Sequence, residues 1–98
     1  MQRMTRPAGG QGAAMIDGKY LIGAEDGYAG PAAERLAALE NLCEKLLGEQ
    51  QELAAELKRL RSLDKTRTSR FRELMGNKLM NANTIGQLKL YGLIDDEI

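Results

Sequence analysis

The sequence predicts an all-α fold: one long amphipathic, coiled-coil-like helix, then two short helices, assembled into an oligomeric helical bundle. Between residues 31 and 63, core residues repeat at alternating spacings of three and four, the period of a coiled-coil seam. A shorter amphipathic pattern follows in the last third of the chain. The predicted oligomerisation seam consists of Leu36, Leu39, Cys43, Leu46, Gln50, Leu53, Leu57 and Leu60.

The composition excludes several functions. The 98 residues suffice for one domain at most, and 14 basic residues balance 14 acidic ones, so no overall charge selects nucleic acid or a membrane. Histidine is absent and Cys43 is the single cysteine, which leaves no Ser–His or Cys–His nucleophile pair and no internal disulfide. We therefore predict a protein that is not an enzyme and has no cofactor and no metal.

The cellular location follows from the same inventory. A single reduced thiol and the lack of a secretory leader favour the cytoplasm. The chain contains no run of about 18 apolar residues, so no membrane contact is predicted.

The first 30 residues are expected to lie outside the helical part. Residues 1–14 form a Gly-rich tail that carries too little apolar surface to fold and is predicted to be disordered, with Met15 as an alternative start of the chain. Residues 15–30 contain two Asp-Gly turn dipeptides around residues 19–22, which read as a short strand. We expect this extended segment to pack on a helix or to pair with another subunit.

The long helix is predicted over residues 31–63. Pro31 suits the first helical position, where its missing N–H would have no partner. Gly48 costs about 1 kcal/mol, but no turn residue stands beside it, so we favour a continuous helix over a break there. Such a helix is roughly 50 Å long, whereas a compact chain of this length has a radius of gyration of about 13 Å. We therefore predict that a second chain covers the seam, and the flanking charges favour a parallel pair. A two-helix seam would leave Leu42 and Leu47 exposed, so either the C-terminal helices fold back on them or more than two chains assemble, with Gln50 helping to fix the register.

The last third of the chain is predicted to hold a helix over 70–81 and a short helix over 85–91. A capping box starting at Thr84 marks the second start, and Gly92 fits a left-handed helix end. Together, residues 31–98 form the predicted helical oligomerisation domain. A DNA-binding helix-turn-helix is the alternative, but the second helix offers few base-reading side chains and we favour packing on the long helix. The expected buried face of the 70–81 helix comprises Phe71, Leu74, Met75, Lys78 and Leu79.

Charge is segregated along the chain. Residues 34–56 carry six acids and two bases, and residues 58–72 carry seven bases and one acid. Backbone N–H groups at a helix start, hydroxyls and fixed cations can together bind a phosphate. A solvated basic turn and a site for an acidic protein remain as alternatives. The predicted phosphate site consists of Lys65, Thr66, Arg67, Thr68, Ser69 and Arg70.

These observations predict a small, non-catalytic helical homo-oligomer that binds a nucleotide or a nucleic acid backbone through the basic 58–72 segment. Such architectures occur among the accessory and sequestering proteins of bacteriophages and mobile elements. The alternative function is a protein-binding inhibitor or adaptor that uses the coiled-coil surface or the N-terminal arm.

Overall fold

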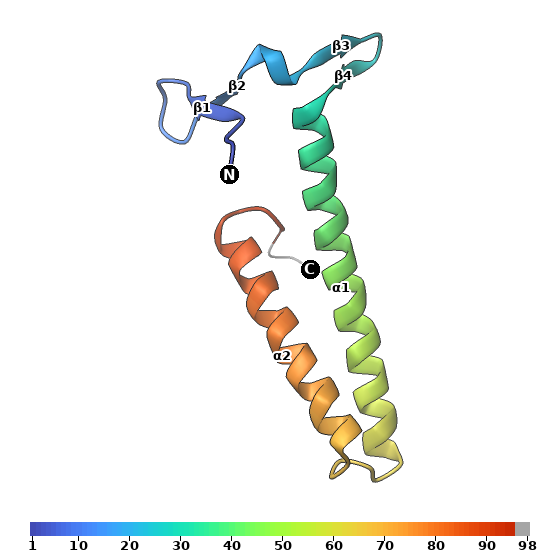
Figure 1. Ribbon diagram of the computed structural model, residues 1–98. Coiled ribbons are helices and arrows are strands. Elements are labelled where there is room, and N and C mark those ends of the chain that lie inside the picture. The colour runs from blue at the N-terminus through green and yellow to red at the C-terminus, as the bar shows by residue number, and fades with distance from the viewer. Residues whose placement is uncertain (96–98) are drawn as a thin grey trace. The chain divides into compact units, whose positions relative to one another are not determined.

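The computed structural model describes residues 1–95 and contains both strands and helices (Figure 1). The all-α prediction is therefore wrong: two small antiparallel sheets precede the helices. The chain divides into two compact units, residues 1–41 and the residues from 42 onward. In chain order, the elements are β1 (Thr5–Pro7), β2 (Ala14–Ile16), a 3₁₀ turn (Gly18–Tyr20), β3 (Ile22–Ala24), β4 (Gly27–Ala29), α1 (Pro31–Ser62) and α2 (Ser69–Leu90).

The first unit contains two short hairpins. β1 pairs with β2, and β3 pairs with β4, each over three residues. The predicted disorder over residues 1–14 is corrected by this finding, because that segment supplies β1 and the start of β2. Gly9 and Gly12, with φ of 88° and 70°, take left-handed conformations in the loop between the two strands. Glycine adopts these angles without steric cost, so the Gly-rich run reverses the chain rather than leaving it unfolded.

Hydrogen bonds fix the path from the hairpins into α1. Asp17 accepts a hydrogen bond from the Lys19 N–H at 3.1 Å and caps the 3₁₀ turn, so residues 18–20 form a helical turn where a strand was expected. Gly30 has a φ of 106°, and a Cβ there would lie 2.8 Å from the carbonyl oxygen of Tyr20. Only glycine fits this close approach.

α1 is continuous through Gly48 and ends one residue before the predicted limit. Its C-terminus closes with two backbone hydrogen bonds, from the Lys65 N–H to the Leu60 carbonyl at 2.9 Å and from the Asp64 N–H to the Arg61 carbonyl at 3.0 Å. This is a Schellman motif, in which the residue after the helix is left-handed. Asp64 occupies that place with a φ of 58°, where glycine is the usual residue.

α2 is a single helix over residues 69–90, so the predicted division into helices 70–81 and 85–91 is wrong. Thr84 does not cap a new helix, because its hydroxyl donates back to the Met80 carbonyl at 3.3 Å. Asn81, read as part of a helix end, instead donates from its side chain to Glu49 on α1 at 3.4 Å. The helix ends at Leu90; Gly92, with a φ of 73°, is the left-handed residue that follows its C-cap, and the Leu93 N–H donates to the Leu88 carbonyl at 2.8 Å.

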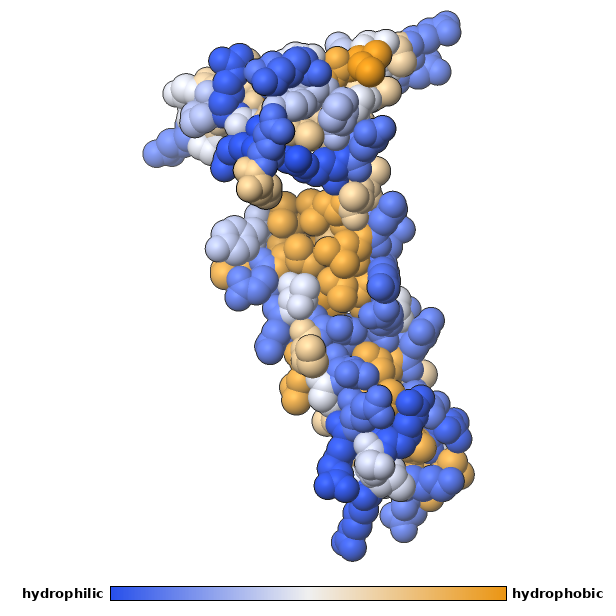
Figure 2. Space-filling view, in the orientation of Figure 1, coloured by the Kyte–Doolittle hydropathy of each residue, from blue (hydrophilic) through white to orange (hydrophobic). Residues whose placement is uncertain are grey.

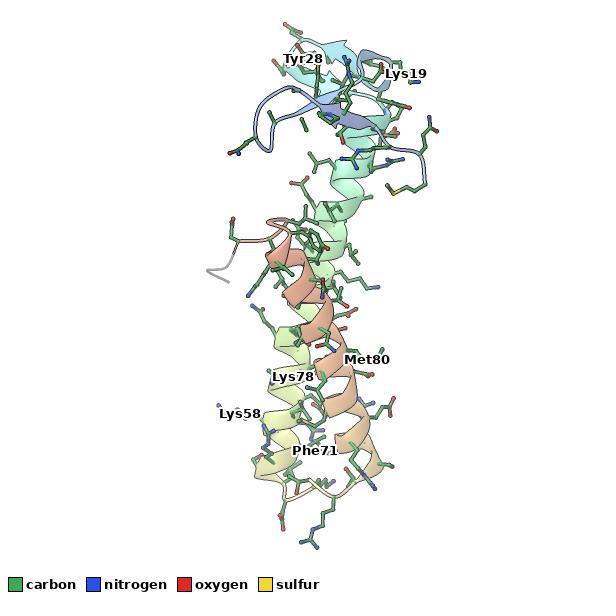
Figure 3. All side chains as sticks on the ribbon, turned by 90° about the vertical axis from the view of Figure 1, so that its left-hand side faces the viewer. Lys19, Tyr28, Lys58, Phe71, Lys78 and Met80 are labelled. Atoms are coloured by element: carbon green, nitrogen blue, oxygen red, sulfur yellow. The ribbon has the colours of Figure 1, made fainter. Side chains whose placement is uncertain are left out.

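In the second unit, α2 folds back along α1 as an antiparallel helical hairpin (Figures 1 and 3). Its core lies near the connecting loop, where Leu57 is fully buried and contacts Leu60 and Leu74. Residues further from the loop, including Cys43 and Ile85, are also buried. The structure therefore places the seam from Cys43 to Leu60 in a hairpin with α2 of the same chain, the role that the sequence assigned to a second chain. The partly buried residues around this core are Leu53, Phe71 and Met75.

Candidate functional site

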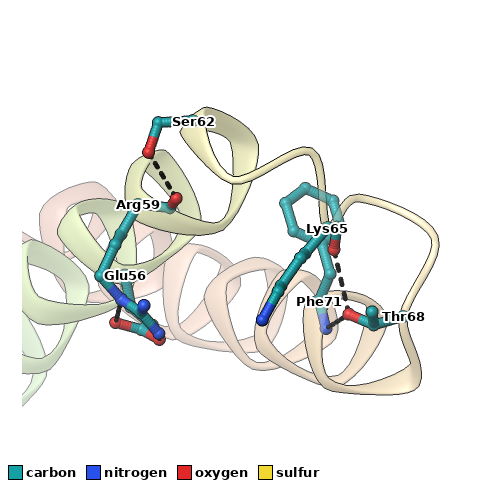
Figure 4. A network of polar contacts seen from close by, with 6 residues as sticks. All are labelled: Glu56, Arg59, Ser62, Lys65, Thr68 and Phe71. Atoms are coloured by element: carbon teal, nitrogen blue, oxygen red, sulfur yellow. Dashed lines mark hydrogen bonds and ion pairs between the residues drawn. The ribbon is translucent and has the colours of Figure 1, made fainter.

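The predicted phosphate site lies in the loop between α1 and α2 and in the first turn of α2. Thr68 is the N-cap of α2: its hydroxyl accepts a hydrogen bond from the Phe71 N–H at 3.1 Å and donates to the Lys65 carbonyl at 3.0 Å (Figure 4). The cap satisfies one N–H group of the first turn, as N-cap hydroxyls do. Both bonds of this hydroxyl hold the loop together, so Thr68 has no proton left to donate to an anion.

Arg70 does not join the other basic residues of the loop. It lines a groove between α1 and α2 together with Glu49, Glu52 and Glu56. Its positive charge is one of the influences that lower the pKa of Glu56. Arg70 therefore lies on an acidic side of the hairpin, and the six predicted site residues do not converge on one point.

Two further arginines of the basic segment also have partners. Arg59 binds Glu56 with two hydrogen bonds, at 3.0 and 2.6 Å, and Arg61 lies over the Phe71 ring with 5.4 Å between the guanidinium carbon and the ring centroid. The hydrogen bond from Arg59 lowers the pKa of Glu56 below its ordinary value, partial burial opposes this shift, and the charge of Arg59 adds to it. The same bond raises the pKa of Arg59.

Four basic side chains remain around the loop. Lys58, Lys65, Arg67 and Arg72 are exposed, and their side chains make no hydrogen bond or ion pair within the part of the chain that the structure describes. Thr66 and Ser69 are exposed beside them. The arrangement is an open basic end of the hairpin that can attract an anion, and it lacks the enclosed donors of a specific phosphate pocket.

Exposed apolar side chains on both helices are the second candidate feature. On α1, Leu36 is 58% exposed and Leu42 is 45% exposed, and Figure 2 shows hydrophobic residues at the surface of this helix. On α2, the exposed fractions are 63% for Leu79, 69% for Met80 and 76% for Leu90. The sequence pattern placed Leu79 on the buried face with Phe71, whereas the helix turns it to solvent. If the helical pattern had been continued over the whole of α2, it would have placed Leu79 on the exposed side.

The polar residues between the helices are few. The Gln50 side chain donates from Nε2 to the Lys78 carbonyl at 3.1 Å, and its Oε1 is buried without a partner in the described part of the chain.

No group of three or more His, Cys, Asp or Glu residues within residues 1–95 could hold a metal ion. Over the same residues, neither helix has a stretch that is long and apolar enough to cross a membrane.

A comparison of the chain with protein-family models, curated proteins and solved structures found no match.

Proposed function

We propose that this chain is a non-catalytic protein that acts by associating with protein surfaces, and first with another copy of itself. The observation that supports the proposal is the share of large apolar side chains left in solvent. Three leucines or methionines of α2 alone are more than 60% exposed. Exposed apolar patches of this kind mark protein–protein contacts, and small helical units commonly need such contacts to be stable.

Sedimentation equilibrium or native mass spectrometry of the intact chain tests this proposal. We expect a homo-oligomer at micromolar concentration, and a melting temperature that rises with protein concentration because association stabilises the folded state. A folded monomer at all concentrations up to the millimolar range would contradict the proposal.

Capture of a phosphate-bearing ligand is the second candidate. It is supported by Lys58, Lys65, Arg67 and Arg72, whose exposed side chains have no described partner. An open set of cations of this kind binds nucleic acid backbones through salt-dependent contacts. The contact would be weak and would not select one nucleotide.

Calorimetric titration at low salt against short DNA, short RNA and mononucleotides tests this second function. The structure distinguishes two arginines that the sequence treats alike. Arg67→Ala should weaken binding, because Arg67 is free, whereas Arg70→Ala should have little effect, because Arg70 lies beside Glu56. Absence of binding by the wild type would exclude a phosphate ligand.

We further propose a reducing compartment, the cytoplasm, for this protein. Cys43 is buried and unpaired. A chain whose single thiol lies inside a helical hairpin gains nothing from an oxidising environment, where disulfides add stability.

A further inference from the structure

One side of α2 carries an apolar stripe, defined here as Met75, Leu79, Ala82, Gly86 and Leu90. Successive members are three or four residues apart, so they lie on one face of the helix. Ala82 and Gly86 line a groove with Leu47 and Gln51 of α1. A Cβ added at Gly86 would meet no atom within 4 Å, so the stripe has open space above it.

We propose that this stripe is the surface through which two copies of the chain associate, with the two α2 helices antiparallel. The inference rests on the proposed function, self-association, and names the face and the orientation. In an antiparallel pair centred between residues 82 and 83, Leu79 lies opposite the partner's Gly86, and Met75 lies opposite the partner's Leu90. Each exposed leucine thus meets a small or a flexible residue, and one surface serves both copies, as a two-fold interface requires.

The charges at the two ends of α2 select the antiparallel orientation. Bases precede and begin the helix, with Lys65, Arg67 and Arg72 exposed and without described partners. Acids follow its end, starting with Asp95, and the sequence continues with Asp96 and Glu97. Antiparallel helices bring the basic end of one copy beside the acidic end of the other, whereas parallel helices would place like charges together. This charge complementarity between the two ends of α2 favours a second copy as the occupant.

The opposite side of the hairpin provides a matched control. Met80 is adjacent to Leu79 in sequence and about equally exposed, at 69% against 63%, but it lines the other groove with Glu49 and Glu52. Figure 3 shows Met80 and Lys58 on opposite sides of the hairpin. Leu79→Asp and Met80→Asp therefore place the same charge on two different faces without touching the buried core.

The first experiment compares the dissociation constants of these variants by sedimentation equilibrium. We expect Leu79→Asp to raise the constant by about 30-fold or more, as for a central interface residue, and Met80→Asp to leave it nearly unchanged. Equal effects of the two variants would overturn the assignment. Loss of association on Leu36→Asp, with Leu79→Asp silent, would instead place the contact on the first half of α1.

Disulfide cross-linking tests the same face without measuring a dissociation constant. In a Cys43→Ser background, Ala82→Cys places a thiol next to the proposed two-fold axis, and we expect it to form a covalent dimer rapidly under mild oxidation. Asn77→Cys, exposed on the other side, should not. If the wild type is dimeric by mass but Ala82→Cys fails to cross-link, the stripe is wrong and self-association stands; a monomeric wild type would overturn both.

Charge-reversal variants test the antiparallel orientation of the two α2 helices. Asp95→Lys should weaken association and Arg72→Asp should weaken it likewise, while the double variant should recover most of the loss, because the opposite charges face each other again. Additive losses in the double variant would exclude the antiparallel arrangement.

Discussion

Gln50 on α1 donates a hydrogen bond to the backbone carbonyl of Lys78 on α2 at 3.1 Å, and this bond spans the middle of the helical hairpin. It is the polar layer between the apolar core near the loop and the buried Cys43 and Ile85 further along. Polar residues at such seam positions fix register at a cost in stability. The cost is visible here, because Gln50 Oε1 is buried without a partner in the described chain.

Replacing Gln50 by Leu should therefore stabilise the hairpin. We expect the free energy of unfolding to rise by about 1 kcal/mol, since a buried acceptor without a partner is removed. The Lys78 carbonyl keeps its helical environment in the variant. Urea unfolding measures the change, and Gln51→Leu, at the exposed neighbouring position, is the control that should change little. A loss of stability in Gln50→Leu would show that the hydrogen bond outweighs the unpaired oxygen.

Asp64 is a second site where the sequence is not optimal for the fold. Its left-handed φ of 58° closes the end of α1, and glycine takes this conformation without the steric cost that an L side chain carries. Asp64→Gly should raise the free energy of unfolding by about 0.5–1 kcal/mol, and Asp64→Val should lower it. Thermal unfolding of the two variants beside wild type distinguishes them. The idea fails if Asp64→Val is as stable as Asp64→Gly.

The ion pair between Glu56 and Arg59 makes stability depend on pH. The pKa of Glu56 in the folded protein is lower than its ordinary value of 4.5, first because of the hydrogen bond from Arg59. The pair therefore stabilises the fold above the unfolded-state pKa, and this contribution is lost as the pH falls through the lower folded-state pKa. NMR titration should show the pKa of Glu56 rising in Arg59→Gln and unchanged in Arg35→Gln. An identical pKa in wild type and Arg59→Gln would exclude the pair in solution.

Two leucines of the predicted seam should respond differently to truncation. Leu57 is fully buried, so Leu57→Ala should cost about 2–5 kcal/mol of unfolding free energy. Leu36 is 58% exposed, so Leu36→Ala should stay within about 0.5 kcal/mol. Chemical denaturation at a protein concentration below the association range measures both. Similar losses at the two positions would mean that a second chain covers the whole seam.

The helices were largely predictable because their signals are local or strictly periodic. Pro31 and the three–four repeat gave α1, and Gly92 gave the end of α2. The continuity of α2 was not predictable, since Asn81 has a poor helix propensity that its contact with Glu49 across the hairpin overrides. The strands span three residues each, too few for a period of two to stand out.

The candidate site was predictable in position and not in geometry. The run of hydroxyls and bases located the loop before α2, and Thr68 is the cap that such a run provides. The side on which Arg70 lies depends on how α2 is rotated about its own axis relative to the acidic residues of α1. This rotation is set only when the hairpin forms. The same dependence on phase hid the exposure of Leu79.

Because Cys43 is buried, the rate at which its thiol can be labelled measures how often the hairpin opens. The residue is 8% exposed and carries the single thiol of the chain. A thiol-specific reagent in excess can reach it only when the hairpin opens, so the labelling rate reports the frequency of that opening. Labelling should slow as protein concentration rises if association holds the hairpin closed. The labelling rate of this one native side chain would then report both the opening of the hairpin and its assembly.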